Sequence, residues 1–250
     1  MADADHPLHL LIRRLERNHL LSQEDRGALM ALPYKLRWLE AATYTVREGD
    51  DPRVCSILLS GFAYRQKITG GGARQIIAVH IPGEALDFQN LFLDVSDHNV
   101  QMLTRGQVAD VPIAAFQKIA MERPEVGRAI LVTTLIEASI YREWVLNVGR
   151  RDSRSRLAHL LCEFALRLES QGLAHPERGF DLPMTQEQLA DTTGLTPVHV
   201  NRVLKTLESE GLILRNRRNI SFPDWRRLRD VGDFNQRYLH LREREEHGAF

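Results

Sequence analysis

The side chains best suited to chemistry gather near the end of the sequence, in residues 182–222. Thr185 opens a capping box with the glutamine three residues later, which predicts a helix start, and Gly194 predicts that helix's end. Thr196 and Pro197 supply the N-cap and the first residue of a second helix. Two short helices joined by a glycine-bearing turn indicate a helix-turn-helix. The expected inward face of the second helix is Val200, Val203, Leu204 and Leu207.

The outward face of this second helix and the segment after it carry the residue types that bind DNA. The first residues of such a helix enter the major groove, where arginine pairs with guanine and asparagine or histidine reaches base edges. Residues 212–222 follow as a predicted hairpin with a basic tip, which we interpret as a wing that touches phosphate. The candidate DNA contacts are Thr185, Gln186, Thr196, Val198, His199, Asn201, Arg202, Lys205, Arg215, Arg217 and Arg218.

Local charge, and not overall charge, supports a DNA partner. The chain has 33 Lys and Arg against 33 Asp and Glu, so a polyanion must be recognised by one surface of a neutral protein. Between Leu195 and Arg229, eight basic residues face three acidic ones, a surplus of five positive charges. A small helical subdomain with a solvated basic face is the alternative interpretation of this pattern.

The elements before this region predict a β-rich unit and a long helix. Residues 8–32 have helical spacing, and residues 36–111 are short β-prone runs with glycine turns, typical of a jelly roll. The helical pattern from Glu125 to Asn147, about 24 residues and about 36 Å long, outruns the core of a small domain. We therefore expect it to pair with its counterpart in a homodimer. The predicted contact stripe is Ile130, Thr133 or Thr134, Glu137, Ile140, Tyr141, Trp144 and Val148.

Residues 182–213, LPMTQEQLADTTGLTPVHVNRVLKTLESEGLI, resemble the Crp/Fnr family of bacterial transcription regulators. The order of elements agrees over nearly all of the chain. In the cyclic AMP and oxygen-sensing branches, the recognition helix carries a glutamate near its start and an arginine four residues later. Here Val198 stands at the glutamate position and Arg202 is retained. Contact of Arg202 with guanine is implied by the resemblance, but the usual half-site sequence is not.

The resemblance also implies an α+β fold and a division of labour. Residues 1–124 would form a cyclic-nucleotide-binding-like β-roll (jelly roll), 125–149 a dimerisation helix, 150–225 a winged helix-turn-helix, and 226–250 a C-terminal helical extension. It implies a homodimer on double-stranded palindromic DNA near promoters, which contacts or excludes RNA polymerase. A small-molecule effector acting through the β-roll is a possible further partner.

The resemblance points to a ligand cassette that this chain has altered. Relatives that bind cyclic nucleotides have Gly-Glu and later Arg-Ser-Ala, and the arginine neutralises the phosphate. Gly83-Glu84 keeps the first part, but His98-Asn99 stands at the second, and a neutral imidazole cannot replace a guanidinium on phosphate. We expect no tight cyclic AMP binding unless Arg65 or Arg74 holds the phosphate. The effector-pocket candidates are Glu84, His98, Asn99, Tyr141 and Arg142; Glu84 is either an effector contact or an ordinary turn carboxylate.

Other classes of function lack the residues they need. The two cysteines form no CxxC pair and no N-terminal cluster, so no iron–sulfur cofactor is expected. His80 before Gly83-Glu84 is similar to a cupin metal site, but without His-x-His we expect a strand histidine and no metal. No nucleophile–base pair indicates an enzyme. A cyclic-nucleotide-binding module acting on a protein partner is the remaining alternative, against which the helix-turn-helix counts.

The sequence offers no sign of export or membrane insertion. Residues 8–21 are too polar for the apolar core of a signal peptide, and no run approaches about 18 apolar residues. We therefore expect a cytoplasmic protein.

Overall fold

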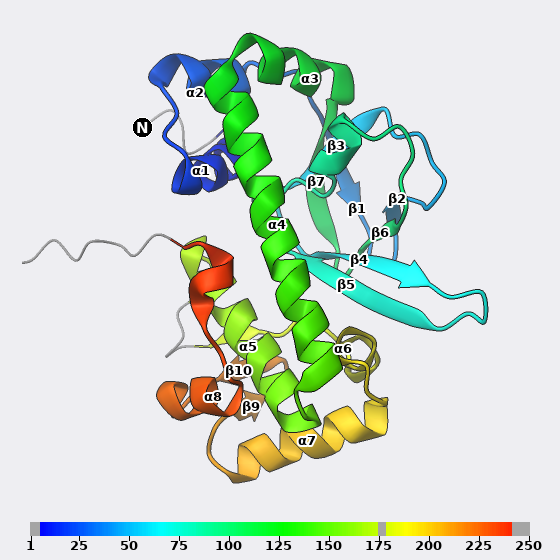
Figure 1. Cartoon of the computed structure of the whole chain (residues 1–250), viewed down its shortest axis with the longest axis vertical. Coiled ribbons are helices and arrows are strands. Elements are labelled where there is room, and N and C mark those ends of the chain that lie inside the picture. Colours follow the sequence, from blue (N-terminus) through cyan, green and yellow to red (C-terminus); the bar gives the residue numbers. More distant parts are fainter. Residues whose placement is uncertain (1–5, 175–178, 242–250) are drawn as a thin grey trace, which may run out of the picture.

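The computed structural model describes residues 6–174 and 179–241, arranged along one long helix (Figure 1). The chain opens with two short helices, and Ser22 caps the second one, with its hydroxyl accepting from the backbone N–H of Asp25. Seven strands follow in two sheets, ordered β1-β7-β3 and β2-β6-β4-β5. The elements are α1 (His9–Asn18), α2 (Gln23–Met30), β1 (Lys35–Leu39), β2 (Tyr44–Val46), β3 (Val54–Leu58), β4 (Ala63–Ile68), β5 (Arg74–His80), η1 (Phe88–Leu91), β6 (Asn99–Met102) and β7 (Gly106–Pro112).

The two sheets enclose a small apolar core, as the predicted jelly roll requires. Strand β7 pairs antiparallel with β1 and β3, and β4 pairs antiparallel with β5 and β6. Because side chains alternate between the two faces of a strand, each sheet sends one set of apolar residues inward. The side chains shared by both sheets are Leu39, Val46, Leu58, Ala63, Leu86, Val100, Met102 and Val108. The α+β class is confirmed.

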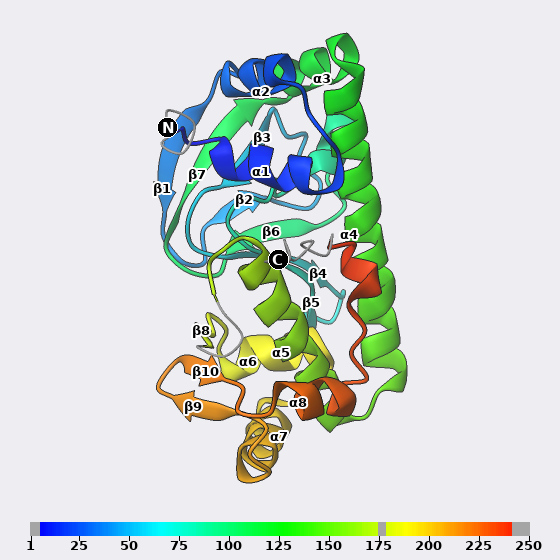
Figure 2. The ribbon, with the colours of Figure 1, turned by 90° about the vertical axis from the view of Figure 1, so that its left-hand side faces the viewer.

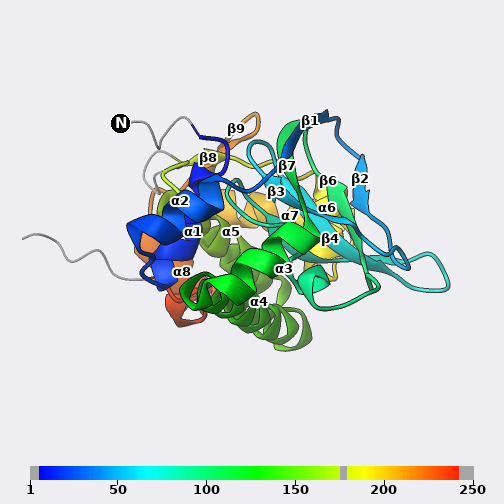
Figure 3. The ribbon, with the colours of Figure 1, turned by 90° about the horizontal axis from the view of Figure 1, so that it is seen from above.

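Helix α3 (Ile113–Glu122) leads into α4 (Pro124–Arg150), the long helix. The predicted long helix is confirmed. However, α4 continues through Gly149, and the backbone becomes extended only at Arg151. The stripe predicted for dimer contact is wrong. Ile130, Ile140 and Trp144 are buried inside the same chain, because the β-roll and the C-terminal half both pack on that side of the helix. Figures 2 and 3 show that the opposite long side of α4 is uncovered.

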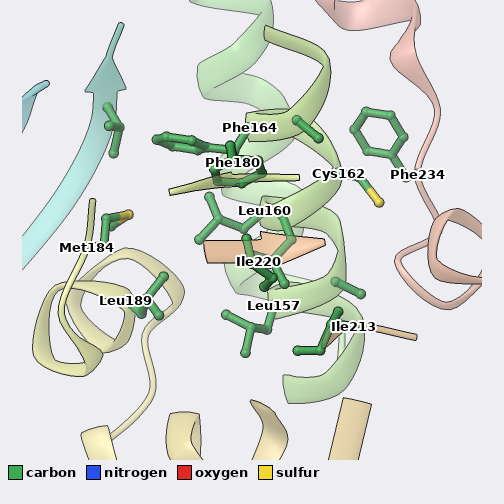
Figure 4. Close-up of a cluster of buried hydrophobic side chains, with 14 of the residues drawn as sticks. Leu157, Leu160, Cys162, Phe164, Phe180, Met184, Leu189, Ile213, Ile220 and Phe234 are labelled. Atoms are coloured by element: carbon green, nitrogen blue, oxygen red, sulfur yellow. The ribbon is translucent and has the colours of Figure 1, made fainter. Parts of the chain in front are cut away.

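The C-terminal half is built around α5 (Ser153–Ser170), whose N-cap is Asp152. Leu157, Leu160 and Phe164 of this helix face Phe180 and Ile220 of a small sheet (Figure 4). The sheet order is β8-β10-β9. The remaining elements are β8 (Phe180–Asp181), α6 (Gln186–Thr193), α7 (Pro197–Ser209), β9 (Leu214–Asn216), β10 (Asn219–Ser221), α8 (Trp225–Val231) and η2 (Gln236–Leu239).

Up to residue 241, the expected C-terminal extension consists of one short α-helix, α8, and one turn of 3-10 helix, η2. Residues 242–250 of that extension lie outside the described residues. Among the described residues, none of the helices combines the length and apolar character needed to cross a membrane.

Candidate nucleic-acid interface

The start and end of α6 follow the local signals in the sequence. The Thr185 hydroxyl accepts from the backbone N–H of Gln188 at 3.2 Å, and the Gln188 side chain accepts from the Thr185 N–H at 2.8 Å. At the other end Gly194 adopts φ 66°, and its N–H donates to the carbonyl of Ala190. A side chain is strained at that φ, so glycine is required for the sharp turn into α7. The capping box and the turn are confirmed.

Helix α7 is oriented by its cap and by its buried face. The Thr196 hydroxyl accepts from the backbone N–H of His199 at 3.3 Å, and Pro197 is the first helical residue. Val200 and Leu207 are fully buried, and α7 packs against α5 and α6. These contacts decide which side chains face away from the protein. Figures 1 and 2 show α7 at the extremity of the molecule opposite α2 and α3.

The outward face of α7 forms a shallow hollow of about 500 Å³ lined by polar and basic residues. Val198, which lines it, is 81% exposed, and the exposed Arg202 and Lys205 have no ion-pair partner among the described residues. His199 and Asn201 are half-buried, and only Asn201 lines the hollow. The lining is Val198, Asn201, Arg202, Lys205, Thr206 and Ser209. Unpaired cations on a projecting helix suit a polyanion.

The wing is present, and its arginines differ in their partners. Strands β9 and β10 pair with Asn216 opposite Asn219, which leaves Arg217 and Arg218 exposed at the tip. Arg215 donates to Glu208 of α7 at 2.7 Å, so it braces the wing against that helix. The tip arginines, and not Arg215, are the ones free to meet phosphate.

Two features near the interface were not predicted from the sequence, strand β8 and an ion pair between α6 and the β-roll. Strand β8 has only two residues, too short to show an alternating pattern, yet it completes the wing sheet. The Thr185 hydroxyl is used by the cap, while Gln186 is exposed at the start of α6. Helix α6 is also tied to the β-roll, because Arg74 of β5 pairs with Asp191 at 2.6 Å. The two residues are 117 positions apart, so no local pattern in the sequence could indicate this pair.

The effector-pocket candidates do not gather at one place. A cavity of about 660 Å³ lies between β5 and the C-terminal half of α4, and both His98 and Tyr141 line it. Glu84, Asn99 and Arg142 do not. Asn99 accepts from the backbone N–H of Glu48, and Arg142 donates to Ser139 on the exposed side of α4. Only two of the five candidates therefore share the cavity.

Glu84 is the centre of a buried ion-pair network. Its carboxylate lies 2.9 Å from Arg14 of α1, 3.0 Å from Arg167 of α5 and 3.2 Å from His80. Burial alone raises the pKa of Glu84, but the two guanidinium groups outweigh it and hold the pKa well below its usual range. These contacts give Glu84 a structural role between the two halves, and Glu84 lies outside the cavity lining.

The polar residues that suggested other chemistries have structural partners. His80 ends β5, as predicted, and burial lowers its pKa to about 4. Burial also raises the pKa of both Cys55 and Cys162, which are free and buried thiols. Within residues 6–174 and 179–241, no three His, Cys, Asp or Glu side chains gather as a metal site would require.

Both halves of the chain match known protein families. Residues 36–123 match a family described as cyclic nucleotide-binding domain, and residues 155–231 match a family described as Crp-like helix-turn-helix domain. Transcriptional activator protein FnrL of Cereibacter sphaeroides is 28% identical over 214 residues, which cover 84% of this chain and 85% of the relative. A probable transcriptional activator of Rhizobium leguminosarum bv. viciae is 29% identical over 190 residues, which cover 75% of this chain and 77% of the relative.

Solved structures agree on the fold. FixK2 from Bradyrhizobium japonicum superposes with a TM-score of 0.73 at 23% identity, over 80% of this chain and 98% of that one. A c-di-GMP-responsive global regulator of Xanthomonas campestris superposes with a TM-score of 0.64 at 18% identity, over 80% and 99%.

Proposed function

The chain belongs to the Crp/Fnr family of transcription regulators, and we propose that it acts as a homodimer on a palindromic promoter site. It is a DNA-binding regulator with an effector-binding domain, and not an enzyme. The single observation that carries the proposal is the outward face of α7, where Arg202 and Lys205 are exposed without ion partners on a helix fixed by its cap.

The side chains of the interface have separate roles in this proposal. Arg202 reads a guanine by a bidentate hydrogen bond, and the exposed Val198 meets a thymine methyl group. Lys205, Arg217 and Arg218 contact phosphates and so give affinity without sequence preference. His199, Asn201 and Gln186 are secondary contacts, while Thr185 and Thr196 mainly hold the helix ends in place.

The dimer contact is proposed for the uncovered side of α4 (Figures 2 and 3). Leu131 and Leu135 are each 57% exposed there, one helical turn apart, and Leu146, 45% exposed, continues the exposed apolar residues toward the C-terminal end. Burying such a stripe against its copy removes apolar surface from water. A two-fold axis along this helix pair would make the DNA site palindromic.

The remaining roles follow from family membership. We propose that the protein works in the cytoplasm, that it acts on transcription by contacting or excluding RNA polymerase, and that the cavity beside β5 holds its effector. Residues 1–124 would sense, 125–149 would pair the chains, and 150–225 would bind DNA.

Selection of DNA fragments by the purified chain, followed by sequencing, tests the proposal. We expect an inverted repeat with half-sites about 10 base pairs apart, centre to centre, or a multiple of this.

Light scattering is expected to give twice the 28.6 kDa chain mass. Leu135→Arg is expected to give monomers with weakened site binding, whereas Leu20→Arg, at an exposed leucine of another surface, stays dimeric. A monomeric wild-type chain that selects a single unrepeated half-site contradicts the proposal.

A further inference from the structure

The cavity between the β-roll and α4 has the size and lining of a small-molecule site. Its volume of about 660 Å³ lies within the usual range for ligand pockets. Ile76 and Ile77 of β5 form one wall, and Trp144, Val145 and Val148 of α4 form the other. A ligand that fills this space must therefore be largely apolar.

The positive charge in the cavity wall is already neutralised. Among the described residues that line the cavity, Arg65 is the one arginine or lysine, and it is 2% exposed. Its guanidinium lies 3.6 Å from Asp87 and 4.0 Å from Glu137. It also donates to the Leu86 carbonyl at 2.7 Å and to the Tyr141 hydroxyl. An anionic ligand would have to compete with two carboxylates for this one cation.

A further carboxylate opposes anions at the polar end of the cavity. Asp97 lines the cavity and accepts from His98 at 2.6 Å, and this hydrogen bond lowers the pKa of Asp97. The carboxylate is therefore ionised at neutral pH. Because the Asp97 side chain is 80% exposed and Lys67 lies near it, its repulsion of a second negative charge is screened, and this carboxylate opposes anions less than the buried carboxylates at Arg65 do.

One donor in the wall has no partner. Among the described residues, two buried nitrogen atoms of lining residues have no hydrogen-bond partner, Nε of Arg65 and Nε2 of His98, and the Arg65 Nε–H can only donate. Leaving a buried N–H unpaired costs free energy, and a ligand oxygen or nitrogen with a lone pair would remove that cost. This donor is a point at which a ligand in the mostly apolar cavity can be oriented.

We propose that this cavity binds a largely apolar small molecule that carries no negative charge and presents one hydrogen-bond acceptor to Arg65. The inference rests on the proposed function, since it assigns a ligand class to the effector site of that regulator. This ligand class excludes cyclic nucleotides, because their phosphate always carries a negative charge.

The same walls touch the DNA-binding half, so occupancy can reach α5 and α6. Trp144 donates its indole N–H to Glu163 of α5 at 2.9 Å. Gln75, which also lines the cavity, donates to the Thr192 carbonyl of α6 at 3.3 Å. A ligand that prefers one spacing of β5 and α4 would shift the position of α6.

Two dyes with the same ring system test the charge preference. N-phenyl-1-naphthylamine is uncharged, and 8-anilino-1-naphthalenesulfonate adds one sulfonate to it. Fluorescence titration of the full-length protein is expected to give saturable binding of the uncharged dye, with one site per chain, and at least tenfold weaker binding of the sulfonate. Equal or tighter binding of the sulfonate, or no saturable binding of the uncharged dye, overturns the proposal.

Substitutions locate the site. Ile77→Trp fills the cavity and is expected to weaken the uncharged dye at least tenfold, while Ile68→Trp, the same change outside the cavity lining, leaves it within twofold. Asp97→Asn is expected to reduce, by at least twofold, the ratio between the dissociation constant of the sulfonate dye and that of the uncharged dye. Unchanged binding in Ile77→Trp overturns the assignment to this cavity. Dye binding is read without DNA, so its failure is distinct from a failure of DNA selection, which tests the proposed function.

Discussion

The molecule holds two sets of charged side chains that differ in burial and pairing. In the network between the two halves, Glu84 lies about 3 Å from two arginines, and all three side chains are nearly excluded from water. On α7 and the wing tip, Arg202 and Arg217 are exposed and unpaired among the described residues. The comparison teaches that pairing and burial, and not residue type, separate a charge that stabilises the fold from one available to a partner.

Removing a buried charge should have the largest effect on stability. Glu84→Gln leaves Arg14 and Arg167 without their counter-charge, so we expect a loss of about 3–5 kcal/mol in the free energy of unfolding. Urea unfolding followed by circular dichroism measures it. Glu187→Gln, at a side chain that is 74% exposed, is the matched control and should stay within about 0.5 kcal/mol. Equal stability of the two variants would remove the distinction drawn above.

Acid should weaken the fold through a buried histidine. Burial, assisted by the charge of Arg151, lowers the pKa of His159 to about 4, and its ring contacts the Tyr238 hydroxyl and lies 3.6 Å from Glu143. Between pH 6.5 and 4 the unfolded chain binds a proton that the folded chain does not. Stability therefore falls with falling pH, by up to about 1.4 kcal/mol per pH unit for this group.

Urea unfolding at pH 7 and pH 5 measures this slope. In His159→Gln the slope of the free energy of unfolding against pH should be smaller by as much as one proton. An unchanged slope in His159→Gln would show that the ring is already protonated in the folded state or that other groups set the pH dependence.

The cap of the recognition helix should have an intermediate effect. Thr196→Ala removes the acceptor for the His199 N–H, and we expect a loss of about 1 kcal/mol in the free energy of unfolding together with weaker DNA binding. Thr196→Ser keeps the hydroxyl and should retain both. If alanine and serine behave alike, the hydroxyl does not fix the start of α7.

The ion pair that ties α6 to the β-roll should contribute least. Arg74 and Asp191 are 27% and 22% exposed, so solvent screens their attraction. A double-mutant cycle with Arg74→Gln and Asp191→Asn is expected to give a coupling energy of about 0.2–1 kcal/mol, smaller at high salt. A coupling of several kcal/mol would place this pair with the buried charges.

The same contrast explains what the sequence predicted well. The caps at Thr185 and Thr196 depend on residues three positions apart, so spacing alone was sufficient. Glu84 and Arg167 are 83 positions apart, and no local pattern records that contact. The stripe on α4 failed for a related reason. That helix has apolar residues on two sides, and periodicity does not tell whether Trp144 or Leu135 faces the chain's own core.

Binding of wild-type, Arg202→Ala and Arg217→Ala proteins to a set of single-base-substituted sites, at two salt concentrations, tests the central claim most directly. We predict that Arg202→Ala costs about 1–3 kcal/mol per half-site and removes the preference at one base pair. Arg217→Ala should weaken all sites alike and reduce the salt dependence by about one ion per contact. If Arg202→Ala lowers affinity uniformly and leaves every base preference intact, α7 does not read DNA through Arg202, and the account is contradicted.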